Sequence, residues 1–387
     1  MNIQRKIKWV FLAMFFFSLN VAITGYVNST LMKTAGLSDN FISALYVGSA
    51  LITLSILPLI PRITNKIGNT RFVILLLTTS LLSILGILFI KQNIILGISF
   101  IFFLIINFLV IFEMDVFLEH FSDTKHTGRI RGIFFTIINL TWALSPLLAG
   151  ILIEHLNISW VYIIGSISVV LSGVVIFTKL RSTKFKKKIL HSTKASLTRM
   201  LKNKNLRNIF LLSSMLHFFY SFSAIYLPLY LFSTIGFTWV QIGALILIGN
   251  IPFLLLGYPI GYLSDIWGEK QLLITGIIIS ILGTLGFILT KEPQFFAWAI
   301  LFFVSRIGIS TLETTSESYT FKNIEHDDTE TLSIQRDATP FGYIIAPVMG
   351  YVIQIFTDSY IPIFIGVIIV MLLSFYPAIK LKNNHVN

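Results

Sequence analysis

Residues 94–118 read IILGISFIFFLIINFLVIFEMDVFL, and the only ionisable side chains in this stretch are those of Glu113 and Asp115. A helix needs about 20 mostly apolar residues to cross the hydrocarbon core of a bilayer. Open strands are excluded at that depth, because lipid offers no partner for unpaired backbone groups. The stretch therefore predicts one membrane-spanning helix.

The whole chain has the same character. Of its 387 residues, 55% are apolar and only 12% are charged, about half of the charged share of an ordinary soluble domain. This excludes a soluble enzyme, a disordered chain and a coiled coil. The chain has no cysteine, and no phosphate-binding loop, metal triad or nucleophile constellation stands out. We therefore predict no metal, no cofactor and no enzyme activity.

Twelve apolar segments are long enough to span the membrane, so we predict an all-α polytopic membrane protein with twelve transmembrane helices. The basic residues before the first segment precede an apolar run too long for a signal peptide, which predicts a retained first span. The predicted spans are 8–32, 40–61, 71–90, 94–118, 130–154, 159–178, 208–233, 239–263, 271–290, 294–316, 338–356 and 360–379.

Basic residues are distributed very unevenly about these spans. With the N-terminus in the cytoplasm, 25 of the 29 Lys and Arg residues fall on the cytoplasmic side, and only Lys33, Lys91 and Lys291 fall on the other. The positive-inside rule therefore predicts a multi-pass protein of the cell membrane with both termini in the cytoplasm. Anionic lipid accounts for the net charge of +12, so no nucleic-acid partner is needed.

The two halves of the chain are related by an offset of 200 residues. The matching pairs that carry weight are Tyr26 with Tyr226, Thr34 with Thr234, Gly36 with Gly236, Gly68 with Gly268, Gly86 with Gly286 and Lys91 with Lys291. We predict two six-helix bundles, 1–178 and 208–387, joined by a basic cytoplasmic linker at 179–207. The linker is either a partly helical segment on the membrane surface or a solvated connection. Parallel repeats of this kind are typical of transporters.

Residues 261–270 read GYLSDIWGEK and follow the eighth span. The spacing of Gly261, Asp265 and Gly268 resembles the short loop signature of the major facilitator superfamily, which joins the second and third spans of each half. In the first half Gly68 fits the signature, but Asn65 stands where the family has Asp. The resemblance covers nearly the whole chain and implies the family's fold, with two pseudo-symmetric bundles.

The resemblance also implies a gate and a branch. In the family the loop Asp faces the start of the fifth or eleventh span of the opposite half, which assigns Asp265 a contact with Arg129 or Arg131. Residues 145–150, SPLLAG, resemble a relaxed signature of the drug/proton antiporters. A similar pattern at 346–350, APVMG, indicates instead a packing feature shared by both halves.

Ionisable residues inside spans are costly in lipid and mark functional sites. Span ten carries Arg306, Glu313 and Glu317 on one helical stripe, and the resemblance implies that this span lines the transport cavity. We expect these residues to take part in proton coupling. The alternative is an internal ion pair that fixes helix packing.

Span four carries Glu113 and Asp115, and Glu113 matches Glu313 in the repeat. We therefore expect Glu113 and Glu313 to approach each other near the pseudo-symmetry axis, where two close carboxylates would suit proton uptake and release. The alternative is that one of them pairs with a nearby basic residue.

Polar side chains on spans one, four and seven are candidates for the lining of the cavity. His217 could bind substrate or relay protons, although a lone histidine in a helix is more often a hydrogen-bonded structural residue. The candidates are His217, Tyr220, Tyr226, Asn20, Tyr26 and Asn107.

Together these features predict a monomeric secondary active transporter that moves a small solute by alternating access, coupled to protons, with efflux of drug-like compounds as the leading substrate class. A sugar or metabolite carrier of the same fold is the alternative. A non-transporting membrane sensor or scaffold is the alternative from another class, supported by Asn65 in place of Asp. Flux in proteoliposomes separates a transporter from a sensor.

Overall fold

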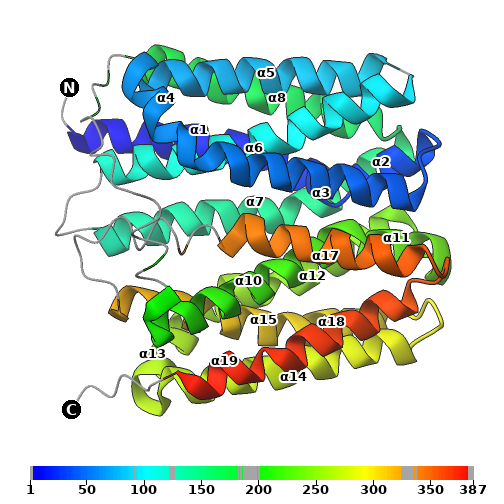
Figure 1. The fold of residues 1–387 in the computed structure, drawn as a ribbon. Coiled ribbons are helices and arrows are strands. Elements are labelled where there is room, and N and C mark those ends of the chain that lie inside the picture. Colours follow the sequence, from blue (N-terminus) through cyan, green and yellow to red (C-terminus); the bar gives the residue numbers. More distant parts are fainter. Residues whose placement is uncertain are drawn as a thin grey trace. The chain divides into compact units, whose positions relative to one another are not determined.

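The computed structural model describes residues 3–90, 92–121, 127–181, 183, 185, 198, 201–323, 335 and 338–381, and every regular element among them is a helix. The chain divides into two compact units (Figure 1). One comprises Met1–Leu190 with Thr238–Gly243, and the other comprises His191–Phe237 with Ala244–Asn387. We describe each unit by itself.

In the first unit α1 packs against α7 and α8, while α5 packs against α6 and α8. Figure 1 shows α5 and α8 running side by side. The helices are α1 (Ile3–Gly25), α2 (Asn28–Thr34), α3 (Asp39–Ile56), the 3-10 turn η1 (Leu57–Leu59), α4 (Ile60–Ile67), α5 (Asn69–Phe89), α6 (Asn93–Phe121), α7 (Thr127–His155), α8 (Ser159–Val175) and the π-helical turn η2 (Ile176–Leu180).

In the second unit the pairs α14 with α15 and α10 with α17 form the principal helix contacts. The helices are α10 (Lys204–Ile225), α11 (Leu227–Tyr230), the π-helical turn η3 (Leu231–Ile235), the part of α12 (Trp239–Leu255) that follows Gly243, α13 (Gly257–Trp267), α14 (Glu269–Leu289), α15 (Phe295–Asn323), α17 (Ala338–Gln354), α18 (Ile361–Leu373) and α19 (Phe375–Lys380).

The predicted spans correspond to these helices. Ten helices of the described chain are long and apolar enough to cross a membrane, and α12 with α13, bent by 44°, makes an eleventh. The remaining predicted span corresponds to α17, whose 17 described residues include Pro347 and fall slightly short of a full crossing. The bend after α12 follows Pro252, as expected from a residue that cannot donate a helical hydrogen bond.

Large apolar side chains cover the outer surfaces of the helices. Leu82 is 62% exposed and Phe296 is 82% exposed, which would be unfavourable in water, where burial of apolar area stabilises a fold by about 25 cal/mol per Å². In a bilayer the same side chains face acyl chains instead. The surface therefore agrees with the membrane assignment made from composition.

The repeat is visible in the backbone as well as in the sequence. Four glycines have positive φ, and they form two pairs separated by 200 residues: Gly36 (89°) with Gly236 (86°), and Gly68 (87°) with Gly268 (87°). No described residue of another type has positive φ. Gly68 and Gly268 separate α4 from α5 and α13 from α14. Glycine adopts this conformation without a steric penalty, which explains why these matches stand out among many uninformative ones.

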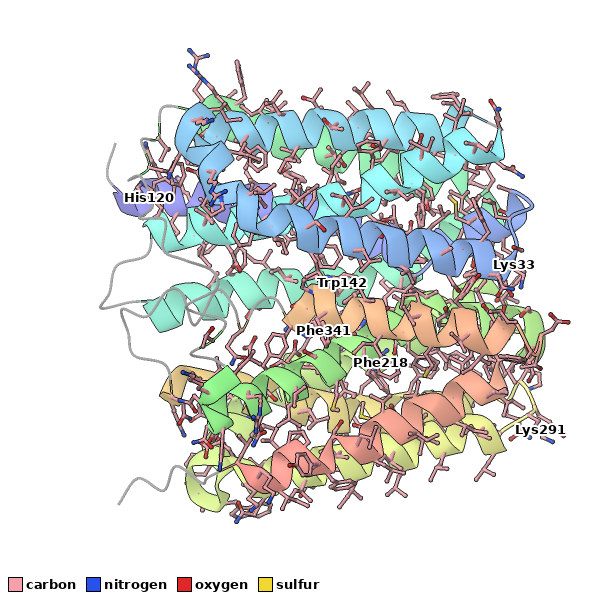
Figure 2. The ribbon with its side chains drawn as sticks, in the orientation of Figure 1. Lys33, His120, Trp142, Phe218, Lys291 and Phe341 are labelled. Carbon is pink, nitrogen blue, oxygen red and sulfur yellow. The ribbon has the colours of Figure 1, made fainter. Side chains whose placement is uncertain are left out.

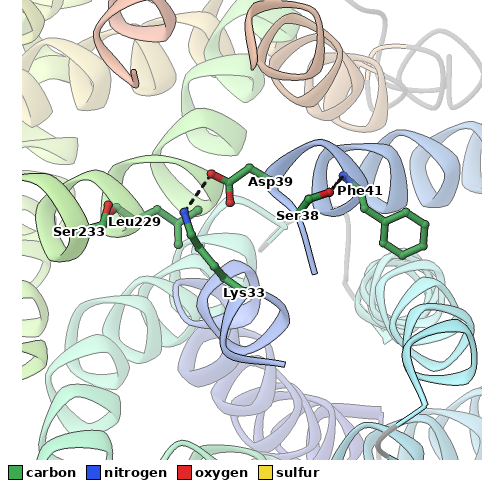
Figure 3. A network of polar contacts seen from close by, with 6 residues as sticks. All are labelled: Lys33, Ser38, Asp39, Phe41, Leu229 and Ser233. Atoms are coloured by element: carbon green, nitrogen blue, oxygen red, sulfur yellow. Dashed lines mark hydrogen bonds and ion pairs between the residues drawn. The ribbon is translucent and has the colours of Figure 1, made fainter. Parts of the chain in front are cut away.

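The corner between α2 and α3 shows how the two halves have diverged (Figure 3). Lys33 forms an ion pair of 2.9 Å with Asp39, and the Ser38 hydroxyl accepts a hydrogen bond from the Phe41 backbone N–H. At the position equivalent to Lys33 the second repeat has Ser233, whose hydroxyl donates to the Leu229 carbonyl. Lys33 and Asp39 are both accessible, so their pair contributes only about 0–1 kcal/mol.

Candidate functional site

The second unit holds an arginine in the middle of a span. Arg306 lies on α15 and is only 4% exposed. Its guanidinium lies over the ring of Phe219 on α10, 5.2 Å from the ring centroid. Its side-chain stem faces Gly249 on α12, where an added Cβ would lie 3.3 Å from the Arg306 Cγ. An aromatic ring on one side and a glycine on the other thus make room for a buried cation.

Glu313 stands two turns from Arg306 on the same helix, about 10 Å along the axis. Its carboxyl group is hydrogen-bonded to the Tyr220 hydroxyl of α10 and lies within electrostatic range of Arg306. Neither Arg306 nor Glu313 forms an ion pair with another side chain that the structure describes. The alternative of a direct ion pair between these two residues therefore does not describe this geometry.

His217 lies one turn before Tyr220 on α10. Its Nδ1 is 2.7 Å from the Ser213 carbonyl oxygen, and its Nε2 is 3.0 Å from the Thr339 hydroxyl of α17. The rings of Tyr220 and Tyr343 lie 5.9 and 6.4 Å from the imidazole. A carbonyl can only accept, so Nδ1 carries a proton. The histidine thus links α10 to α17 and lies beside Tyr220.

The charged residues on the α15 stripe become more exposed toward the C-terminal end of the helix. Glu313 is partly accessible, whereas Glu317, one turn further, is exposed. Arg306 and Glu313 are therefore brought together with Tyr220, and Glu317 lies at the surface. Tyr226 is buried elsewhere in the unit, where its hydroxyl reaches the Pro347 carbonyl of α17 at 3.5 Å.

The candidates of the first unit do not all gather in one cluster. Asn20 of α1 donates to the Asn107 side-chain oxygen of α6 at 3.4 Å, and both amides are buried. Tyr26 packs edge-on against Trp142 of α7, with ring centroids 5.7 Å apart (Figure 2 labels Trp142). Glu113 is 1% exposed and accepts a hydrogen bond of 2.9 Å from the Asn69 amide at the start of α5.

Asp115 of α6 is only partly accessible. The prediction that Glu113 approaches Glu313 concerns two different units and stays a prediction.

The predicted gate is described only in part. Gly68 and Gly268 begin the short connections described above, Asn65 lies on α4, and Gly261 lies on α13 with open space where a Cβ would be. The side chains of Asp265, Arg129 and Arg131 lie outside the described residues.

An ion pair between a buried carboxylate and a partly accessible lysine was not predicted from the sequence. Glu269 is 0% exposed and accepts a hydrogen bond of 2.8 Å from the Lys322 ammonium at the end of α15. The repeat aligns Glu269 with Asn69, whose amide also contacts the following helix, but at Glu113, which is equivalent to Glu313 and not to Lys322. The alignment of the two halves could have pointed to Glu269, because Glu269 and Asn69 directly follow the matched glycines Gly268 and Gly68. Among the described residues, no three His, Asp or Glu side chains gather in a way that could hold a metal ion.

Comparisons with known proteins agree with this architecture. Three solved structures share the fold over nearly their full length. A bacterial homologue of the iron transporter ferroportin in an inward-facing state has a TM-score of 0.74 at 14% identity, covering 98% of this chain and 99% of its own. A variant of the nucleoside transporter NupG has a TM-score of 0.73 at 13% identity, covering 98% and 99%.

The third structure is a bacterial homologue of the human lysosomal transporter Spinster, with a TM-score of 0.72 at 11% identity, covering 97% and 96%. A search of curated proteins finds no sequence match. The family model described as Major Facilitator Superfamily matches residues 10–332 and 241–385. Loop signature, tandem repeat, all-helical fold and family match together place this chain in the major facilitator superfamily.

Proposed function

We propose that this protein is a proton-coupled secondary transporter that moves a small solute by alternating access. The observation that carries the proposal is the cluster of Arg306, Glu313 and Tyr220 on α15 and α10. Ionisable groups within a span are costly and are kept where transport or proton movement uses them. No other group of described residues combines a buried cation and a carboxyl group in this way.

The cluster suggests how coupling would work. With Glu313 protonated, the site carries the positive charge of Arg306. With Glu313 ionised, the negative charge of its carboxylate offsets the positive charge of Arg306. A ligand or proton shifts a two-state equilibrium only by its differential interaction with the two states. Protonation of Glu313 changes the electrostatic cost of exposing the site to either side, and so it would bias the conformational equilibrium.

We propose two substrate classes. Efflux of a drug-like compound remains our first proposal, and a sugar or metabolite carrier is the second. The three similar structures are those of an iron-transporter homologue, a nucleoside transporter and a Spinster homologue. Together they favour no single substrate class. Within the second class, the sugar or metabolite carriers, Arg306 favours an anionic metabolite as the substrate. A buried guanidinium that has no ion pair among the described residues suits a metabolite with an anionic group.

An uptake screen in proteoliposomes tests the proposal. Purified protein is reconstituted and offered a panel of drugs, sugars, nucleosides and carboxylated metabolites, with and without a pH gradient. We expect at least one compound to move faster than in empty liposomes and to accumulate only with the gradient. Equal flux with and without the gradient would remove proton coupling. Absence of flux for every compound would favour the sensor or scaffold.

We further propose that the protein is a monomer of the cell membrane, with both termini and the linker at 179–207 in the cytoplasm. The uneven distribution of Lys and Arg supports this orientation. Topology reporters fused at Lys91, Glu154 and Lys291 should report the external side, and reporters at Lys187 and the C-terminus should report the cytoplasm. A cytoplasmic signal at Lys291 would contradict the predicted order of spans.

A further inference from the structure

An apolar groove runs along the outside of the first unit between α5 and α8. Its volume is about 310 Å³. The lining residues are Ile74, Leu77, Thr78, Leu81, Val169, Val170, Gly173, Val174, Phe177 and Thr178. They cover about 10 Å of α5 and about 14 Å of α8 with η2, at 1.5 Å per residue. Val174 and Phe177 are about half exposed, so the groove opens toward the hydrocarbon phase that surrounds the unit.

Two arginines continue the groove beyond one end. Arg71 lies three residues before Ile74 on the lining stripe of α5. Arg181 directly follows η2, four residues after Phe177. The two helix ends are adjacent, because the Thr70 hydroxyl contacts the Leu180 carbonyl at 3.5 Å. The Arg181 guanidinium lies over the ring of Phe177, 5.2 Å from its centroid. Both arginines are exposed, and neither forms an ion pair with a described residue.

Residue types that are common at membrane interfaces lie at the same end of the groove. Trp9 of α1 is partly exposed, and the ammonium groups of Lys8 and Lys179 each lie 5.1 Å from its ring centroid. Tryptophan and basic residues gather where the hydrocarbon core meets the lipid headgroups. Arg71 and Arg181 therefore stand at headgroup level, and the groove between α5 and α8 extends from them into the acyl-chain region.

We infer that the groove between α5 and α8 binds one acyl chain of an anionic phospholipid whose phosphate group is held by Arg71 and Arg181. The groove supplies an apolar surface for the chain, and the arginines supply a planar, always charged donor set that suits a phosphate. A second copy of this chain would present more apolar surface but no complementary charge at this end. The inference does not depend on the transported substrate.

Native mass spectrometry of the full-length protein in detergent tests this site. The protein is titrated with phosphatidylglycerol and with phosphatidylcholine of the same acyl chains. We expect the first phosphatidylglycerol to bind more tightly than the first phosphatidylcholine. Arg71→Gln and Arg181→Gln should each weaken the phosphatidylglycerol complex about fivefold, and the double variant roughly 30-fold, the factors expected for basic residues near an anionic lipid surface.

Three controls separate the groove from general electrostatics. Arg62→Gln removes another exposed charge, from α4 and not from the lining helices, and should leave lipid binding unchanged. Val174→Trp fills the groove and should weaken both lipids without changing charge, with Val170→Phe as a second variant if the first does not fold. Glycerol 3-phosphate, which has the headgroup chemistry but no chain, should not displace the lipid.

Unchanged phosphatidylglycerol binding by the double variant would overturn the inference, and so would an equal loss in Arg62→Gln. Displacement of the lipid by glycerol 3-phosphate would show that the acyl chain does not contribute to binding. A dimer that dissociates in Val174→Trp would identify a second copy as the occupant of the groove.

Discussion

Glu313→Gln is expected to abolish accumulation driven by a pH gradient while leaving exchange of substrate at equal pH intact. Glutamine keeps the size of the side chain and can still hydrogen-bond to Tyr220, but it cannot take up a proton. If one proton accompanies each substrate molecule, a gradient of one pH unit supports about tenfold accumulation. In the variant the ratio of internal to external substrate should fall to about one. The measurement uses proteoliposomes loaded with a substrate found in the uptake screen.

Two comparisons show whether the effect belongs to this carboxyl group. Glu292→Gln removes an exposed carboxylate from the connection before α15 and should accumulate substrate as the wild type does. Glu313→Asp keeps an ionisable group and should retain part of the accumulation. Full accumulation by Glu313→Gln at normal thermal stability would eliminate Glu313 as the coupling residue and move the proposal to another group.

Gly308→Leu should prevent α14 and α15 from packing, and Gly308→Ala should already destabilise the protein. A Cβ on Gly308 would lie 2.6 Å from both the Gly276 carbonyl oxygen and the Ser280 backbone nitrogen. Neither backbone atom can move without separating the helices. Overpacking of this kind costs about 1–3 kcal/mol, and more where the backbone must shift. Thermal unfolding in detergent should show the loss for Gly308→Ala, and Gly308→Leu should not yield a monodisperse protein.

Gly257→Ala is the matched control, because an added Cβ there meets no atom within 4 Å and φ is not positive. It should leave the unfolding temperature unchanged or raise it slightly, since alanine favours helix. A Gly308→Ala protein as stable as Gly257→Ala would mean that α14 and α15 lie further apart than the structure shows.

The spans and the repeat could be predicted because each rests on a local signal. Long apolar runs locate helices, and the matched pairs Gly36/Gly236 and Gly68/Gly268 mark turns whose backbone only glycine adopts readily. The stripe of Arg306 and Glu313 also followed from helical spacing. These features depend on residues that are close in sequence, so no tertiary information was needed to find them.

The partners across helices could not be predicted in this way. Phe219 and Gly249 surround Arg306 from two other helices, and in a chain with 35 phenylalanines no single one stands out. Lys322 and Glu269 are separated by 53 residues. Glu113 shows the limit of the repeat as a guide, because it contacts Asn69 whereas the equivalent Glu313 is hydrogen-bonded to Tyr220.

The two repeats share their glycine turns but differ in the charge of the residues at equivalent positions. The position equivalent to Arg306 is Ile106, and the position equivalent to Glu269 is Asn69. A unit charge that moves through the full membrane potential changes in energy by about 2.3 kcal/mol per 100 mV. The second half would therefore respond to voltage through Arg306, while the first half has an uncharged residue at that depth. If the halves move relative to the bilayer during transport, the membrane potential would act on Arg306 in the second half with no matching cation at the equivalent position of the first.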